Sequence, residues 1–181
     1  MQLNDTKDIV VFPSLFTLKP GQQRLMRVGT LTPVASLEKT YRISVTELPP
    51  EQKPNQPQVI RVLTKLVLPI FIQPSQQVID GGLSEVAVRN GKLSFKVKNT
   101  GNVHFTAQTV RVQGVGEADK SVFVLQRHGW YVLAGASQPY DLEITQKECS
   151  KTKALVIEVK TEKTNFQQRV EMPANACLKR E

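Results

Sequence analysis

The sequence predicts an all-β protein, and three observations lead to this prediction. Valine outnumbers alanine by 22 to 9, and β-branched side chains fit a pleated strand better than a helix, where they lose χ1 freedom. Short apolar or alternating segments follow one another, separated by clusters of turn-forming residues. No segment of helical length shows the 3.6-residue periodicity of an amphipathic helix. With 181 residues, the chain has room for one large or two small domains.

The amino-terminal part of the chain contains short candidate strands. Residues 9–12 (IVVF) and 15–18 (LFTL) are apolar and are separated by a proline. Residues 19–22 (KPGQ) predict a turn, because proline fixes one φ angle and glycine supplies a positive one. Residues 23–28 alternate in part and predict a further strand.

The clearest half-buried strand covers residues 41–48 (YRISVTEL), in which apolar and polar side chains alternate. One face carries Tyr41, Ile43 and Val45, and the other carries Arg42, Ser44 and Thr46. The following residues 49–58 contain four prolines, which donate no backbone hydrogen bonds. We therefore expect a mobile loop there.

Residues 59–73 (VIRVLTKLVLPIFIQ) form the most informative segment, because these fifteen residues are almost all strand formers. Pro69 lies inside the run, so the segment is expected to be an edge strand or to break at this proline. A long apolar edge invites association with another strand, and here only Arg61 and Lys65 supply charge. An ordinary edge covered by a loop or by a dimer partner remains an alternative.

Residues 74–82 (PSQQVIDGG) break the strand pattern and predict a boundary between two domains, residues 1–75 and 76–181. The second part contains about seven β segments. Seven short strands in about 100 residues are typical of an immunoglobulin-like sandwich. The predicted strands are residues 92–98, 103–112, 122–125, 130–133, 142–144, 155–159 and 166–170, with residues 99–102 and 114–116 as turns.

Residues that could carry chemistry are few. His104 and His128 are the only histidines, and Cys149 and Cys177 the only cysteines. No spacing typical of a zinc site, a nucleophilic triad or a phosphate-binding loop is present, so we expect no catalysis, no metal and no cofactor. The histidines are expected to be ordinary polar residues at strand ends. The cysteines predict a disulfide that holds the carboxyl terminus, or alternatively two free buried thiols.

The net charge of +8 is dispersed along the chain. Residues 1–75 carry nine basic against five acidic residues, and residues 76–181 carry fifteen against eleven, so each part has a charge of +4. A dispersed excess favours a solvated surface over a nucleic-acid site. No apolar run is long enough for a membrane helix, and the first residues, MQLNDTKD, show no signal-peptide core.

Five segments together resemble the PapD-like periplasmic chaperones of the chaperone/usher pathway, which assemble fimbriae, in their archaic branch. They are residues 11–28 (VFPSLFTLKPGQQRLMRV), 41–50 (YRISVTELPP), 66–74 (LVLPIFIQP), 99–104 (NTGNVH) and 129–135 (GWYVLAG). The resemblance implies two immunoglobulin-like domains, a periplasmic location and binding of pilus subunits for delivery to an outer-membrane usher. It also implies donor-strand complementation, in which a strand of the chaperone fills a groove in the subunit.

On this resemblance the donor strand lies within residues 59–72. The face expected to enter the subunit carries Ile60, Val62, Thr64, Leu66 and Leu68. Arg61 or Lys65 is expected to anchor the subunit's terminal carboxylate. The segment that begins at Val11 resembles the middle of the family's first domain, so we expect that domain to be incomplete in residues 1–75, since a whole sandwich needs roughly 100 residues.

Two hypotheses from other classes compete with the chaperone. A structural or adhesive β-sandwich protein would use the same exposed edge to form a homodimer. A nucleic-acid-binding module has only the net charge in its support.

Overall fold

The computed structural model describes residues 4–31, 33, 35–49, 60–174 and 176–177. They fall into two compact units, Met1–Ala35 and Ser36–Glu181. The division into domains after residue 75, predicted from the sequence, stays a prediction. In the described part of the chain, no helix is long and apolar enough to cross a membrane.

The first unit is built on one antiparallel hairpin. Strands β1 (Ile9–Phe12) and β2 (Arg27–Thr30) pair with Ile9 opposite Thr30. The predicted turn at residues 19–22 is present: the Gln22 N–H donates to the Lys19 carbonyl at 3.0 Å, and Gly21 has a φ of 77°.

The other strands predicted for this unit are absent or shorter in the structure. Residues 15–18 form no strand, and only the last two residues of 23–28 belong to β2. An apolar segment becomes a strand only where a neighbour offers backbone partners, and the ladder between β1 and β2 is four residues long.

The second unit begins with a longer hairpin. Strands β3 (Lys39–Thr46) and β4 (Lys65–Ile72) are antiparallel and pair along their whole length. The register puts Ile43 opposite Leu68 and Val45 opposite Leu66, so the apolar residues of both strands share one face, as the alternation predicts.

The predicted fifteen-residue strand is shorter in the structure. Val59 and the loop at residues 50–58 lie outside the described residues, and residues 60–64 precede β4. The ladder stops because β3 ends at Thr46, just before a stretch rich in prolines. Pro69 does not break β4: it lies inside the strand, opposite Arg42, and a strand with a neighbour on one side leaves some of its N–H groups unpaired in any case.

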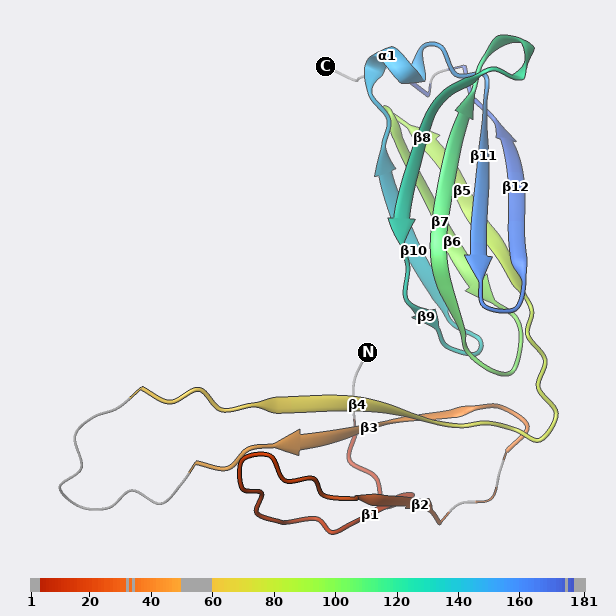
Figure 1. The fold of residues 1–181 in the computed structure, drawn as a ribbon. Coiled ribbons are helices and arrows are strands. Elements are labelled where there is room, and N and C mark those ends of the chain that lie inside the picture. Colours follow the sequence, from red (N-terminus) through yellow and green to blue (C-terminus); the bar gives the residue numbers. More distant parts are fainter. Residues whose placement is uncertain (1–3, 32, 34, 50–59, 175, 178–181) are drawn as a thin grey trace. The chain divides into compact units, whose positions relative to one another are not determined.

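The rest of the second unit is a two-sheet sandwich (Figure 1). One sheet has the order β10-β6-β5 and the other the order β12-β11-β7-β8, with β9 also paired to β7. The strands are β5 (Gly81–Arg89), β6 (Lys92–Asn99), β7 (Phe105–Val115), β8 (Ser121–His128), β9 (Tyr131–Val132), β10 (Ser137–Glu143), β11 (Ala154–Thr161) and β12 (Asn165–Glu171). A 3₁₀ turn, η1 (Glu117–Asp119), and one turn of helix, α1 (Gln146–Cys149), complete it.

Strand β5 was not predicted from the sequence, in which residues 74–82 indicated a domain boundary and the next predicted strand began at residue 92. Its pairing with β6 slips between Ser84 and Ala87, and Glu85 has a φ of 53°. This bulge interrupts the alternation, so the period-two signal of the strand is lost.

Gly114 and Val115 belong to β7 rather than to a turn. A Cβ atom at Gly114 would collide with the ring of Phe123 on the neighbouring β8. The glycine is therefore there for close packing, not for a change of direction.

The hydrophobic core lies between the two sheets. Leu93, Phe95 and Val97 point inward from β6, as the alternation predicts, and they are at most 2% exposed. Apart from Pro74, all the buried apolar residues of the described chain lie between Val88 and Ala176. The all-β class and the immunoglobulin-like sandwich are confirmed.

Candidate functional site

The apolar segment that the sequence singles out is open to solvent in the structure. Ile60 is fully exposed, Val62 is 89% exposed, and Leu66 and Leu68 are about half exposed. Among the described strands, β4 has one neighbour, β3. Thr64 continues the contact with the hairpin, because its carbonyl accepts the Glu47 N–H at 2.8 Å and its own N–H donates to the Glu47 carboxylate. The arrangement offers a free strand edge lined with apolar side chains.

The two predicted anchors lie on the same exposed segment. Arg61 precedes β4, and Lys65 begins it opposite Thr46 on the polar face of the hairpin. Among the described residues, neither pairs with a carboxylate within ion-pair distance. Their role as anchors stays a prediction.

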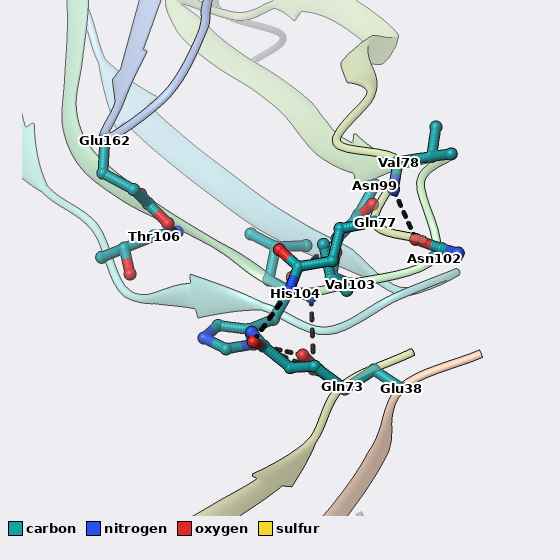
Figure 2. A network of polar contacts seen from close by, with 11 residues as sticks. Glu38, Gln73, Gln77, Val78, Asn99, Asn102, Val103, His104, Thr106 and Glu162 are labelled. Atoms are coloured by element: carbon teal, nitrogen blue, oxygen red, sulfur yellow. Dashed lines mark hydrogen bonds and ion pairs between the residues drawn. The ribbon is translucent and has the colours of Figure 1, made fainter. Parts of the chain in front are cut away.

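A polar junction connects the β3–β4 hairpin to the sandwich, and the NTGNVH motif at residues 99–104 builds it (Figure 2). The Asn102 side chain donates to the carbonyls of Ser36 and Gln76, both at 2.9 Å, and accepts the Val78 N–H at 2.7 Å. One amide therefore holds the chain where it enters the hairpin and where it leaves it.

Glu38 and His104 form the second part of this junction. The Glu38 side chain is fully buried, and both of its oxygens lie 2.8–2.9 Å from Nδ1 of His104. The backbone N–H of His104 also donates to this carboxylate, at 3.2 Å. On its other side the imidazole stacks on Phe71 of β4, with ring centroids 3.8 Å apart.

His104 is thus more than the ordinary strand-end histidine that the sequence predicts. It directly precedes β7, and its ring links Glu38, the residue before β3, and Phe71 of β4 to the sandwich. Sequence reasoning missed this role because Glu38 lies 66 positions away. His128 ends β8 and is exposed, in agreement with the prediction.

Arg42 and Tyr131 form a second contact between the hairpin and the sandwich. Arg42 Nη2 donates to the Tyr131 hydroxyl oxygen, and the guanidinium carbon lies 5.4 Å from the centre of the tyrosine ring. Arg42 Nη1 is buried and has no hydrogen-bond partner among the described residues. The hydrogen-bonding capacity of this guanidinium is therefore only partly used. A buried donor without a partner costs about 1–3 kcal/mol.

Asn99, the first residue of the motif, forms its hydrogen bonds inside the sandwich. It is fully buried, and its amide donates at 2.9 Å to the carbonyls of Val103 and Val132. Its side-chain oxygen accepts the Gly101 N–H, also at 2.9 Å. The two asparagines of the motif therefore have separate tasks: Asn99 shapes the turn, and Asn102 holds the hairpin.

The two cysteines are joined. Cys149 at the end of α1 and Cys177 form a disulfide, with Cα atoms 5.7 Å apart. Helix α1 is fixed at its start by a reciprocal capping box between Thr145 and Glu148. The bond ties the carboxyl-terminal segment to the end of the sandwich.

Features that suggest a reaction centre are few in the described part of the chain. It contains no group of three or more histidine, cysteine or acidic residues that could hold a metal ion. Burial raises the pKa of the Tyr140 hydroxyl, which has no hydrogen-bond partner there and lies in the sandwich against Phe95.

The structure combines an immunoglobulin-like sandwich with a hairpin that carries an exposed apolar strand. Residues 2–77 match the family model of pili and flagellar-assembly chaperones, PapD N-terminal domain. The resemblance of this sequence to PapD-like pilus assembly chaperones is thereby confirmed. No curated protein matches the chain in sequence.

Solved structures of fimbrial chaperones share the fold. The Class 5 fimbriae chaperone CfaA has a TM-score of 0.54 and 16% sequence identity, over 92% of this chain and 73% of its own. A second match, described as a chaperone–tip adhesin complex vital for synergistic activation of CFA/I fimbriae biogenesis, has a TM-score of 0.50 and 18% identity, over 93% and 74% of the two chains. At these identities the likeness concerns the fold.

Proposed function

We propose that this protein is a periplasmic chaperone that binds pilus subunits by donor-strand complementation and delivers them to an outer-membrane usher. Residues 1–75 would be the part of the amino-terminal domain that carries the donor strand, and residues 76–181 would be the second domain. The family match supports the chaperone class, and the open strand supports the mode of binding.

The observation that carries the proposal is the exposure of the segment at residues 60–68. Apolar side chains on an unpaired strand edge gain burial and backbone hydrogen bonds when they enter an incomplete sandwich. Val62 lies on this exposed face and is 89% exposed. Its neighbour Leu63 is also exposed, at 44%, but successive side chains of an extended chain point to opposite faces.

This alternation supplies a matched pair of variants. Each protein is expressed in a bacterial periplasm with a panel of fimbrial subunits and purified, and co-purifying subunit is measured. Val62→Asp is expected to abolish capture, because a charge would be buried in the subunit's groove. Leu63→Asp is expected to retain it. Equal capture by Val62→Asp and the unaltered protein would refute donor-strand binding through this face.

The same edge could instead form a homodimer in a structural or adhesive protein. Analytical ultracentrifugation of the protein alone, combined with the capture experiment, separates the two hypotheses. A monomer that captures a subunit one-to-one supports the chaperone. A concentration-dependent dimer that Val62→Asp dissociates, without subunit capture, supports the alternative.

A further inference from the structure

The turn between β5 and β6 consists of Asn90 and Gly91, the only asparagine–glycine pair in the sequence. Both residues have a positive φ, of 53° and 73°, as a two-residue type I′ hairpin turn requires. An asparagine before glycine is also chemically unstable, because glycine has no side chain that hinders its nitrogen from attacking the asparagine amide. The turn therefore combines a structural role with a reactive group.

The backbone of Gly91 is held by two other segments of the sandwich. Its N–H donates to the Ala176 carbonyl, and its carbonyl accepts the Ile144 N–H, both at 2.8 Å. Gly91 is buried, and a Cβ atom in its place would lie 3.0 Å from the Ile144 carbonyl oxygen. Asn90 is exposed. The fold thus leaves the asparagine open to water and engages the neighbouring nitrogen in a hydrogen bond.

One disulfide joins the two segments that hold Gly91. Ile144 lies just before α1, which ends at Cys149, and Ala176 directly precedes Cys177. Cys149 and Ala176 are each 1% exposed, so both segments are buried against the sandwich at this point. Without the bond between the two cysteines, only noncovalent contacts would keep the Ala176 carbonyl on the Gly91 N–H.

From this arrangement we propose that Asn90 is a site of spontaneous deamidation, protected by the carboxyl-terminal segment that the disulfide holds. In the reaction the Gly91 nitrogen attacks Cγ of Asn90. The new N–Cγ bond replaces the Cγ–Nδ2 bond, and the amide nitrogen leaves as ammonia with the proton given up by the Gly91 N–H. Water then opens the cyclic imide at either carbonyl and gives aspartate or isoaspartate. While the Gly91 N–H donates to Ala176 its nitrogen is not free to attack, so modification requires this segment to open.

The product would damage the hairpin that the turn closes. An isoaspartate sends the backbone through the side chain and adds a carbon atom to it. The two-residue turn then no longer fits the register that pairs Arg89 with Lys92 and Val88 with Leu93. Val88 and Leu93 belong to the core and are 6% and 0% exposed. A chain without the disulfide would therefore accumulate a lesion in its core hairpin, and this inference does not depend on the proposed chaperone function.

The test compares the oxidised full chain with a double variant, Cys149→Ala with Cys177→Ala, during incubation in warm neutral buffer. Peptide mapping by mass spectrometry measures the conversion of Asn90 to its acid forms, and electron-transfer fragmentation separates aspartate from isoaspartate. Conversion is expected to be at least about tenfold faster in the double variant, because its carboxyl-terminal segment opens more often. Equal rates in the two proteins would overturn the proposal.

Asn99→Ala separates local opening from a general loss of stability. It keeps both cysteines and removes three hydrogen bonds of a buried side chain at the other end of β6 from the turn. Conversion of Asn90 in this variant is expected to stay at the rate of the unaltered protein, and circular dichroism checks that all three proteins are folded. A rate as high as that of the double variant would refute protection by the carboxyl-terminal segment.

A measurement on the unaltered protein is independent of any variant. Amide hydrogen exchange of Gly91, followed by NMR, is expected to be slow in the oxidised protein and at least about tenfold faster after reduction with a dithiol. Rapid exchange in the oxidised protein would show that Ala176 does not hold this nitrogen. That result, or exchange unchanged by reduction, would overturn the proposal.

Discussion

Replacing Asn99 by alanine tests how far the turn of the NTGNVH motif stabilises the sandwich. The substitution removes three hydrogen bonds, each 2.9 Å long, and deprives the carbonyls of Val103 and Val132 of the amide donor, while the Gly101 N–H still donates to the Asp80 carbonyl at 3.1 Å. Asn99 is 0% exposed, so water does not replace the amide. At about 1–3 kcal/mol for each abandoned buried group, and with incomplete additivity, the expected loss is about 3–5 kcal/mol.

The matched control is Asn102→Ala, which also removes three side-chain hydrogen bonds. These lie at the surface, where water satisfies the freed groups, so the sandwich is expected to lose about 1 kcal/mol or less.

Urea unfolding followed by circular dichroism and by the fluorescence of Trp130, the only tryptophan, measures both changes. With a slope of about 2 kcal/mol/M, the Asn99→Ala midpoint is expected roughly 1.5–2.5 M lower, and the control within about 0.5 M of the unaltered protein. Equal shifts for the two variants would refute the argument that burial decides the cost.

Three further predictions concern the sandwich. Tyr140→Phe is expected to leave the free energy of unfolding unchanged or raise it, because it removes a buried hydroxyl that has no hydrogen-bond partner among the described residues. Burial raises the Tyr140 pKa above its ordinary value of 10.0, so the unaltered protein should lose stability as the pH rises above that value. The variant should lose less, and unfolding measured as a function of pH checks this. Gly114→Ala should lower stability by about 1–3 kcal/mol in urea titration, because the new Cβ would strike the Phe123 ring; an unchanged midpoint would show that the strand yields easily. Replacing both Cys149 and Cys177, whose disulfide closes a 28-residue separation, should cost about 3–4 kcal/mol on the chain-entropy estimate, and a thermal midpoint equal to that of the oxidised protein would contradict it.

Local patterns sufficed for most of the sandwich. The alternation in residues 92–98 correctly gave the inward face of β6, since the period of a strand is a local property. The same logic failed at β5, where a bulge shifts the side chains by one position, and at Gly114, whose neighbour Phe123 belongs to the next strand.

The open strand shows a similar limit. The composition of residues 59–73 indicated an exposed edge, and the structure leaves Ile60 and Val62 exposed. The ladder nevertheless ends at Lys65, because its length is set by β3, another part of the chain. A strand's extent depends on its neighbour as much as on its own residues.

The sequence by itself determined the all-β class, the immunoglobulin-like pattern of the second part, the apolar strand before Pro74 and the family resemblance. These depend on residue type and on spacing over a few positions. Only the tertiary structure decided that Glu38 meets His104 and that Arg42 meets Tyr131, at separations of 66 and 89 positions. Such pairs form because a hairpin and a sandwich dock through side chains whose distance in the sequence carries no periodic signal, and the partners are fixed only when both elements have folded.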